Sequence, residues 1–393
     1  MSSEISKFIK NVPVGSLKNY FDSVHSDLAK DVDWDSDDES IRKSLLTLSE
    51  GIPIEKVALL GSDTERINSL TDELGQTILK HFVRDEELKE YYQLENEYER
   101  VLWLFLKDTE RFVQVEDSWY TDTRRQGRMW DAFVGPEDLD ISADVDDLSS
   151  FKNKVMDLFR AVGNIKVDVY KRNRPDGEDN EVEIIQIMVY REDLPNTQLT
   201  FDENKKLTSK IVRPVKEVAL TYEPKNGHIE IIAEGTEHRR AIARIFSETL
   251  LKSLIEGDKI PLKQYDIQSL LKPRTLSFDS EDGIESVKVT MLKISPPNSN
   301  NNVTLDVATK EERSIYDLSK EYFGDNDPLK SGFRLRQVRI SIKFMPDHES
   351  RRGKVMHVKI REPNGCDLKS KSQKEKLIGD KYLDQWELVK AIQ

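Results

Sequence analysis

The chain is poor in cysteine and has no long apolar segment. Its 393 residues include one cysteine, Cys366, so no disulfide can form within the chain and no zinc site can use several cysteines. The longest apolar run, 101–106, is far shorter than the roughly 18 residues of a membrane-spanning helix. The N-terminal residues lack the apolar core of a secretory signal peptide. We therefore expect a cytoplasmic protein without a membrane partner.

Several motifs of common enzymes are missing as well. The sequence contains neither of the glycine-rich phosphate-binding patterns G-x-x-x-x-G-K-[ST] and G-x-G-x-x-G, and no G-x-S-x-G nucleophile elbow. This disfavours a dedicated nucleotide hydrolase and a typical α/β-hydrolase. The six histidines include no i, i+4 pair, and none neighbours Cys366. We expect no cofactor and no metal site, and the sequence names no reaction.

The acidic stretch 31–37 has the alternating aspartates of a calcium-binding loop. That loop requires glycine at its sixth position and a bidentate glutamate at its twelfth. The chain has Ser36 and Arg42 there. We interpret the stretch as an acidic loop that precedes a helix starting near Ser40.

Charge is distributed unevenly along the chain. The net charge is −13, yet residues 333–393 carry 15 Lys and Arg against 8 Asp and Glu. The remainder therefore has a net charge of −20, of which −15 falls in residues 1–160. An acidic protein is a poor general coat for nucleic acid or for an anionic membrane. The basic C-terminal segment is the exception.

The hydrophobic periodicity predicts an α+β fold. Up to residue 160 apolar residues recur at helical spacing, and the stripe over 88–105 predicts the longest helix. From residue 164 the period changes to two, which is typical of strands. We predict an acidic all-helical domain over 1–160, a hairpin–hairpin–helix unit over 161–260 and a hairpin–helix–hairpin–helix unit over 261–393. The similar order of elements in the last two suggests an internal duplication. Ser372 and Glu375 match a capping box ahead of the last helix.

The strongest functional signal is a basic hairpin near the C-terminus. In 333–344 and 355–361 apolar and polar residues alternate, so one face of the hairpin is apolar. The other face would carry Arg339, Lys343, His357, Lys359 and Arg361. Cations along a strand face can contact phosphates or an acidic protein surface.

Two arginine clusters are weaker candidates for binding. The first interleaves arginine with tryptophan and tyrosine, a mix that can bind phosphates and stack on bases. In this acidic region it better suits a protein interface or an ion pair with the acidic loop 137–147. It consists of Arg124, Arg125 and Arg128. The second opens a helix, where cations oppose the helix dipole and an anion would be stabilised. It consists of His238, Arg239, Arg240 and Arg244, and pairing with Glu234, Glu237 and Glu248 is the alternative.

These features lead to three hypotheses of function. The first is a non-enzymatic nucleic-acid-associated or regulatory protein whose basic hairpin contacts phosphates and whose helical domain contacts a protein partner. The second is a metal-dependent nuclease, built on Asp168, Lys171 and Glu183 or on Asp347 with His357 and Lys359. The third is a scaffold subunit whose basic face docks an acidic protein.

Cys366 follows a Pro-Asn-Gly turn and has no recognisable catalytic partner. We expect Cys366→Ser to retain every activity and to lower the free energy of unfolding by about 1 kcal/mol if the thiol is buried. Urea denaturation and a binding assay on the variant check this. Loss of binding with unchanged folding would identify a reactive or ligating thiol.

Overall fold

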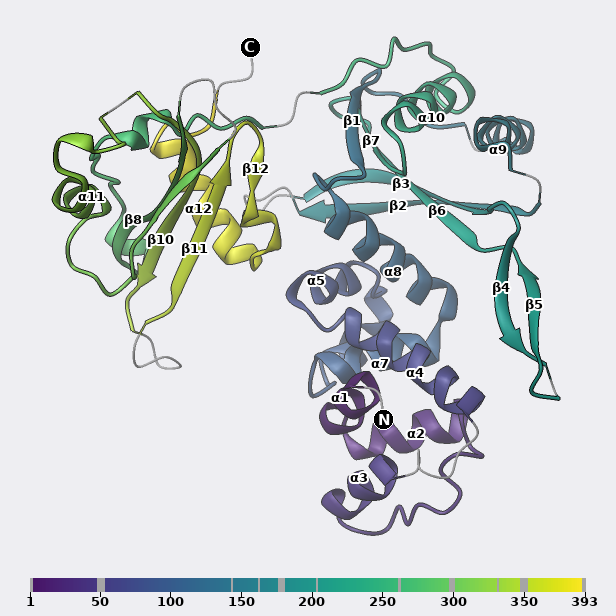
Figure 1. The fold of residues 1–393 in the computed structure, drawn as a ribbon. Helices are drawn as coiled ribbons and strands as arrows, with labels where there is room; N and C mark the ends of the chain where they lie inside the picture. Colours follow the sequence, from purple (N-terminus) through teal and green to yellow (C-terminus); the bar gives the residue numbers. More distant parts are fainter. Residues whose placement is uncertain are drawn as a thin grey trace. The chain divides into compact units, whose positions relative to one another are not determined.

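The computed structural model describes residues 3–47, 54–142, 144–161, 163–175, 181–202, 204–260, 263–296, 301–330, 332–346 and 353–390 (Figure 1). The chain divides into two compact units, Met1–Lys259 and Ile260–Gln393. Helices and three antiparallel sheets make an α+β fold, as predicted. Within the described ranges no helix is long and apolar enough to cross a membrane.

The chain up to Arg124 is helical, which confirms the predicted helical N-terminal region. Its elements are α1 (Ser3–Asn11), α2 (Val14–Val24), α3 (Asp38–Thr47), α4 (Ile54–Ser69), α5 (Glu73–His81), η2 (Asp85–Glu87), α6 (Leu88–Tyr91), α7 (Glu97–Lys107) and α8 (Thr109–Arg124). They enclose an apolar core in which Phe8, Phe21 and Phe112 are fully buried. Burial of each such side chain stabilises the fold by about 1.5–3 kcal/mol.

Side-chain caps set the start of three of these helices. Asp72, Asn96 and Asp108 each accept a hydrogen bond, at 2.6–3.1 Å, from a backbone N–H three residues further on. The cap at Asn96 corrects the single long helix expected over 88–105. Helix α6 ends at Tyr91 and α7 begins anew at Glu97.

A five-stranded antiparallel sheet follows in the same unit. Its strands are β1 (Trp130–Val134), β2 (Ile165–Pro175), β3 (Glu181–Glu192), β6 (Val215–Glu223) and β7 (His228–Ile232), in the order β1-β7-β6-β3-β2. Helices α9 (Val145–Phe159) and α10 (Thr236–Thr249) cover one face, and α8 lies on the other (Figure 1). The predicted burial of the second strand on both faces is confirmed, since Ile184–Val189 is buried without interruption.

The two faces of this sheet differ in chemistry. The face under α9 and α10 is apolar, with Phe151 and Phe246 packed in the same core as Ile187 and Leu220. The face under α8 carries a row of aligned residues across four neighbouring strands. The row consists of Tyr170, Gln186, Thr221 and Glu230. Helix α8 therefore belongs to the helical core on one side and to a polar interface on the other.

Buried hydrogen bonds fill this polar interface. Arg172 donates to both carboxylate oxygens of Asp122 on α8, at 2.6 and 2.8 Å, and to Gln186 Oε1 at 2.6 Å. Glu230 accepts from Arg125 and Arg174, each at 2.8 Å. A buried charge that loses its partner costs several kcal/mol, so these pairs fix α8 on the sheet.

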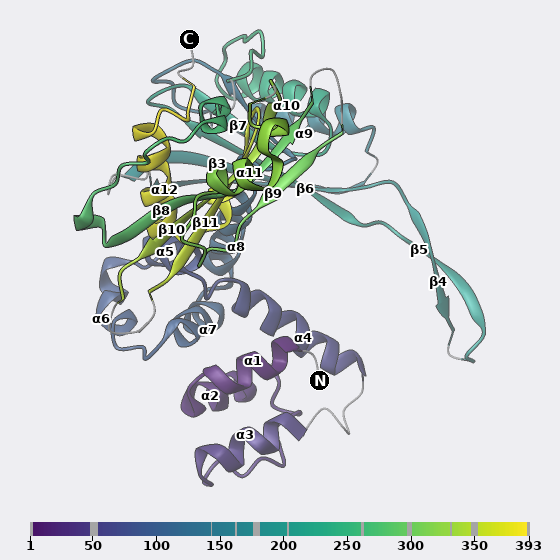
Figure 2. The ribbon, with the colours of Figure 1, turned by 60° about the vertical axis from the view of Figure 1, so that its left-hand side comes forward.

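Strands β4 (Asn196–Phe201) and β5 (Leu207–Val212) form a separate two-stranded arm between β3 and β6. Figures 1 and 2 both show the arm extending away from the five-stranded sheet. Its residues belong to none of the three apolar cores of the described chain.

The second unit is also built on a five-stranded antiparallel sheet. Its strands are β8 (Ile284–Ser295), β9 (Val303–Asp306), β10 (Arg334–Phe344), β11 (Val355–Arg361) and β12 (Gly365–Cys366), in the order β12-β11-β10-β8-β9. Its helices are η3 (Gln268–Leu271), η4 (Ser280–Asp282), α11 (Ile315–Phe323), η5 (Gly324–Asn326), η6 (Asp367–Ser370) and α12 (Gln373–Gln385).

Helix α12 and the segment around η3 cover the inner face of this sheet. Tyr382 and Trp386 are buried in one core with Leu270 of η3 and with the inward residues of the strands. The predicted capping box is confirmed, because Ser372 Oγ accepts from the Glu375 N–H and the Glu375 carboxylate accepts from the Ser372 N–H.

The strand orders of the two sheets do not match. In the first sheet the second strand of the first hairpin, β3, pairs with the next hairpin. In the second sheet the first strand, β8, takes that inner place and β9 lies at the edge. The topology therefore gives no support to an internal duplication.

The first sheet begins earlier in the chain than the boundary expected at residue 160/161. Strand β1 pairs with β7, and Phe151 and Val155 of α9 are buried in the core of the sheet. Residues 130–159 thus pack with the sheet, while the helical core ends with α8.

We expect the fragment Ile260–Gln393 to fold alone, because its core includes no residue of the first unit. Trp386, its only tryptophan, is buried, so its fluorescence should shift cooperatively on urea unfolding. A fragment starting at Ile284 is the matched control. It lacks Tyr265, Ile267 and Leu270 of the same core and should show no cooperative transition. A longer fragment without a transition would contradict the division of the chain.

Candidate functional site

The basic hairpin predicted from the sequence consists of β10 and β11. Their register places Arg339 opposite Lys359 and Gln337 opposite Arg361. The intervening Val338 is buried in the core of the unit. The alternation therefore puts the five predicted residues on the outer face of the sheet. These residues are Arg339, Lys343, His357, Lys359 and Arg361.

Strand β8 adds a lysine that the sequence alone did not bring to this face. Lys293 lies opposite Gln337 on β10, and Gln337 lies opposite Arg361 on β11. Lys293, Gln337 and Arg361 therefore form one row across three strands, which we call the cationic row. Neighbouring strands are about 4.8 Å apart, so the two cations flank the glutamine amide at a separation that long side chains can bridge.

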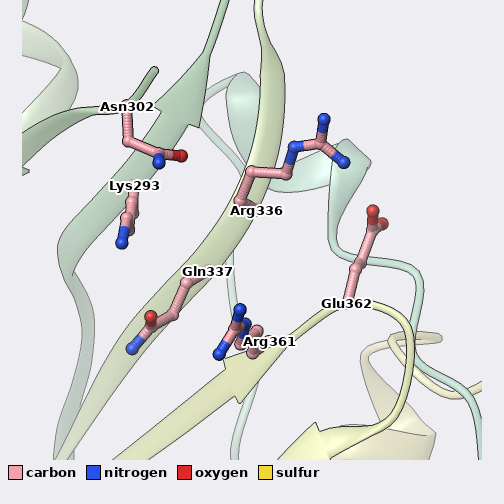
Figure 3. A pocket seen from close by; sticks show the side chains of 6 residues that line it. All are labelled: Lys293, Asn302, Arg336, Gln337, Arg361 and Glu362. Carbon is pink, nitrogen blue, oxygen red and sulfur yellow. The ribbon is translucent and has the colours of Figure 1, made fainter. Parts of the chain in front are cut away.

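A small open cavity lies over the cationic row. Its volume is about 240 Å³, and Asn302, Arg336 and Glu362 line it together with the row. In Figure 3 the side chains of Lys293 and Gln337 lie on one side of the β10 ribbon, and that of Arg336 extends to the other. Arg336 Nε donates to Ser295 Oγ at 2.8 Å. The polar atoms of this cavity are mainly hydrogen-bond donors, which suits an anion.

Carboxylates neutralise only part of the basic face. Arg339 pairs with Asp306 of the edge strand β9, and Lys343 pairs with Glu285 at 2.6 Å. Within the described part of the chain, Lys293, Lys359 and Arg361 form no ion pair. Uncompensated positive charge therefore lies at the cationic row, at the adjacent Lys359 and at Lys288 of β8, which is exposed opposite Ser341 and donates to the backbone oxygen of Glu311.

His357 does not add to this charge at neutral pH. Partial burial, and then the nearby cations Arg339, Lys371 and Lys359, lower the pKa of His357 below its ordinary value. Its Nδ1 lies 2.8 Å from Ser341 Oγ. His357 is thus a neutral hydrogen-bonding group in the basic face, not one of its cations.

The first arginine cluster does not form one site. Arg125 pairs with buried Glu230 and not with the acidic loop that the sequence suggested. Arg124 stacks on the Tyr120 ring, with its guanidinium carbon 3.7 Å from the ring centre. Arg128 is exposed. The structure therefore gives Arg125 a role in fixing α8, and the binding role of Arg124 and Arg128 stays a prediction.

The second cluster is also dominated by internal contacts. Arg239 is buried and donates to Asp131 Oδ2 at 2.6 Å, which ties α10 to β1. Arg240 approaches Glu237 at 3.8 Å, as the alternative interpretation expected. Arg244 donates to the backbone oxygen of Glu256. An anion site at the start of α10 would compete with these contacts.

The acidic metal site expected at Asp168, Lys171 and Glu183 is not assembled. Asp168 and Lys171 point to opposite faces of β2, because they are three positions apart in a strand. Lys171 approaches Glu183 at 3.7 Å, but Asp168 does not converge with them. Asp347 lies outside the described residues. Asp37 accepts hydrogen bonds from the first N–H groups of α3 and so acts as a helix cap. Among the described residues no group of three or more His, Cys, Asp or Glu is placed to hold a metal ion.

A strongly perturbed carboxyl group of the first unit lies on the face of α8 that meets the sheet. Burial raises the pKa of Asp117 to about 7, although a hydrogen bond donated by the Tyr190 hydroxyl opposes the rise. Asp117 Oδ2 has no hydrogen-bond partner. A carboxyl group in such a place is more stable when protonated, so Asp117 couples the stability of the interface to pH.

Two residues of the cationic row were not identified from the sequence as part of the site. Lys293 was assigned to a separate hairpin, and Gln337 was noted only as a polar member of its strand. Helix α11 separates β9 from β10 in the chain, so no short-range signal pairs β8 with β10. Lys288 and Lys293 each lie between apolar residues, but a spacing of five positions predicts opposite faces of a regular strand. The bulge at Arg339/Ile340 in the β8–β10 pairing puts both on the outer face.

Comparisons of the chain with models of protein families and with curated proteins give no match.

We expect Asp117→Asn to flatten the pH dependence of stability. The folded-state pKa is raised, so protonated Asp117 stabilises the wild type fully below about pH 4, and this stabilisation is lost as the pH rises towards 7. The variant cannot ionise. Its free energy of unfolding minus that of the wild type should therefore be about 4 kcal/mol more positive at pH 8 than at pH 4. Urea denaturation at both pH values measures this. The same difference in unfolding free energy between variant and wild type at both pH values would contradict the raised pKa of Asp117.

Proposed function

We propose that the protein is a cytoplasmic, non-enzymatic nucleic-acid-associated protein whose outer C-terminal sheet face contacts the phosphate backbone. The observation that supports this most is the cationic row, in which Lys293 and Arg361 flank the Gln337 amide over an open cavity. Arginine can donate two parallel hydrogen bonds to a phosphate, and lysine adds a compact charge. The acidic helical domain would contact a protein partner.

The chemistry of the cavity favours backbone contact over base reading. None of its six lining residues is aromatic, so no base can stack there as in single-strand binding modules. Contacts to phosphate carry no sequence information by themselves. We therefore expect binding that depends strongly on salt and weakly on sequence.

Charge restricts the contact to this face. The second unit has 24 Lys and Arg against 20 Asp and Glu, whereas the first unit has 36 against 53. An anionic polymer is repelled by the first unit and attracted to the second. Arg339 and Lys343 are paired with carboxylates, so the unpaired cations of this face among the described residues are Lys288, Lys293, Lys359 and Arg361.

The test is the double reversal Lys359→Glu and Arg361→Glu in the full chain. Lys343, although on the same face, is less suitable because it already pairs with Glu285. Each lost phosphate contact removes about 0.9 from the slope of log affinity against log salt on duplex DNA, so the slope should flatten by about two. Both residues are exposed, so each change should alter the unfolding free energy by less than about 0.5 kcal/mol. Fluorescence anisotropy with labelled duplex and single-stranded oligonucleotides measures the slope.

The matched control is Lys272→Glu with Lys320→Glu, which changes the net charge equally. Lys272 follows η3, and Lys320 lies on α11. Leu270 of η3 and Ile315 of α11 pack in the core on the inner side of the sheet. The control should keep the wild-type slope. If both double variants bind like the wild type, the outer face is not the site. If the wild type binds no oligonucleotide but retains an acidic protein that the double reversal releases, the face is a protein-docking surface.

A further inference from the structure

The β4–β5 arm presents an apolar face that the first unit leaves exposed. In its register Phe201 lies opposite Leu207, Leu199 opposite Ser209 and Thr197 opposite Ile211. The four large apolar side chains of these rows therefore share one face. Their exposed fractions are 72% for Leu199, 68% for Phe201, 62% for Leu207 and 71% for Ile211.

The other face of the arm is polar. It carries Gln198 opposite Lys210 and Thr200 opposite Thr208. The contrast between the two faces is that of a sheet with one side packed on a partner and one side in water. Among the described residues, however, β4 and β5 pair only with each other.

An isolated two-stranded hairpin is marginally stable in water, and clustered exposed apolar side chains mark interaction surfaces. We propose that the apolar face of the arm packs face to face on the same face of a second copy of this chain. The arm lies in the first unit and the cationic row in the second, so this inference does not depend on the proposed nucleic-acid binding.

The area available is sufficient for a homodimer contact. A large apolar side chain exposes roughly 150 Å² when fully accessible, so the four exposed fractions amount to about 400 Å² in each copy. Complete burial in two facing copies would remove at most about 800 Å² from these side chains, and Thr197 and Ser209 bring this upper bound to about 1,000 Å². The upper bound reaches the approximate lower limit for a specific interface.

The pattern of side chains fits a second copy in particular. The apolar face carries no charged residue, so two identical faces can meet without burying a charge. A two-fold axis requires that a surface be complementary to itself. In an antiparallel face-to-face contact, the tip row Phe201–Leu207 of one copy covers the base row Thr197–Ile211 of the other. The central row Leu199–Ser209 then meets its own copy.

The first experiment is sedimentation velocity of the full chain from nanomolar to high micromolar concentration. The wild type should dimerise, and Leu199→Ser with Phe201→Ser should raise the dimer dissociation constant at least about a hundredfold. The control is Gln198→Ser with Thr200→Ser on the polar face, which should dimerise as the wild type does. Far-UV circular dichroism should show that all three proteins keep their secondary structure.

A second experiment remains informative even if the serine variants perturb the arm. In a Cys366→Ser background, Ser209→Cys places one thiol beside the proposed two-fold axis, and Thr208→Cys places it on the polar face. Stacked sheets lie about 10 Å apart, so a short bismaleimide should cross-link Ser209→Cys into dimers and leave Thr208→Cys monomeric.

Two results would overturn the inference. One is a wild type that is monomeric throughout the concentration range. Co-sedimentation of that monomer with phosphatidylcholine vesicles would then assign the apolar face to a lipid surface. The other is a dimer that survives the serine substitutions and cross-links equally through both cysteines, since the arm would then lie outside the interface.

Discussion

The contact between α8 and the first sheet is the interaction on which the first unit depends. On one side Phe112 and Val115 anchor the helix in the apolar helical core. On the other side the helix meets the sheet through hydrogen bonds and ion pairs, above all the bidentate contact of Arg172 with Asp122. An apolar interface tolerates small shifts of a helix, whereas a buried fork of hydrogen bonds specifies one position at a cost in desolvation. The orientation of the helical domain is thus set by polar chemistry.

The two five-stranded sheets differ in whether a helix covers their polar face. Each sheet has one apolar face that forms a core and one polar face. In the first unit α8 covers the polar face, and its charged residues Arg172, Arg174 and Glu230 are paired and buried. In the second unit the polar face keeps the exposed cations Lys359 and Arg361. A basic strand face in this chain is therefore a candidate for binding only where no helix supplies the counter-charges.

Local sequence rules predicted what depends on local structure. The alternation around Val338 and Val358 identified the inner and outer faces of the hairpin, and Ser372 with Glu375 marked the start of α12. These rules failed where contacts between residues far apart in the sequence determine the structure. Arg239 looked like an anion-binding residue at the start of a helix, but its partner Asp131 is 108 residues away. Strand β1 was missed because its five residues follow an arginine-rich stretch, precede an acidic loop and become a strand only by pairing with β7.

The short edge strand β9 neutralises one part of the outer face of the second sheet and not the other. Asp306 pairs with the guanidinium of Arg339, so the charge of Arg339 is balanced within the protein. Within the described chain Lys293 and Arg361 of the cationic row form no ion pair, so their charge is balanced by ions from solution. The two parts of one strand face therefore differ in how strongly their electrostatic potential depends on salt.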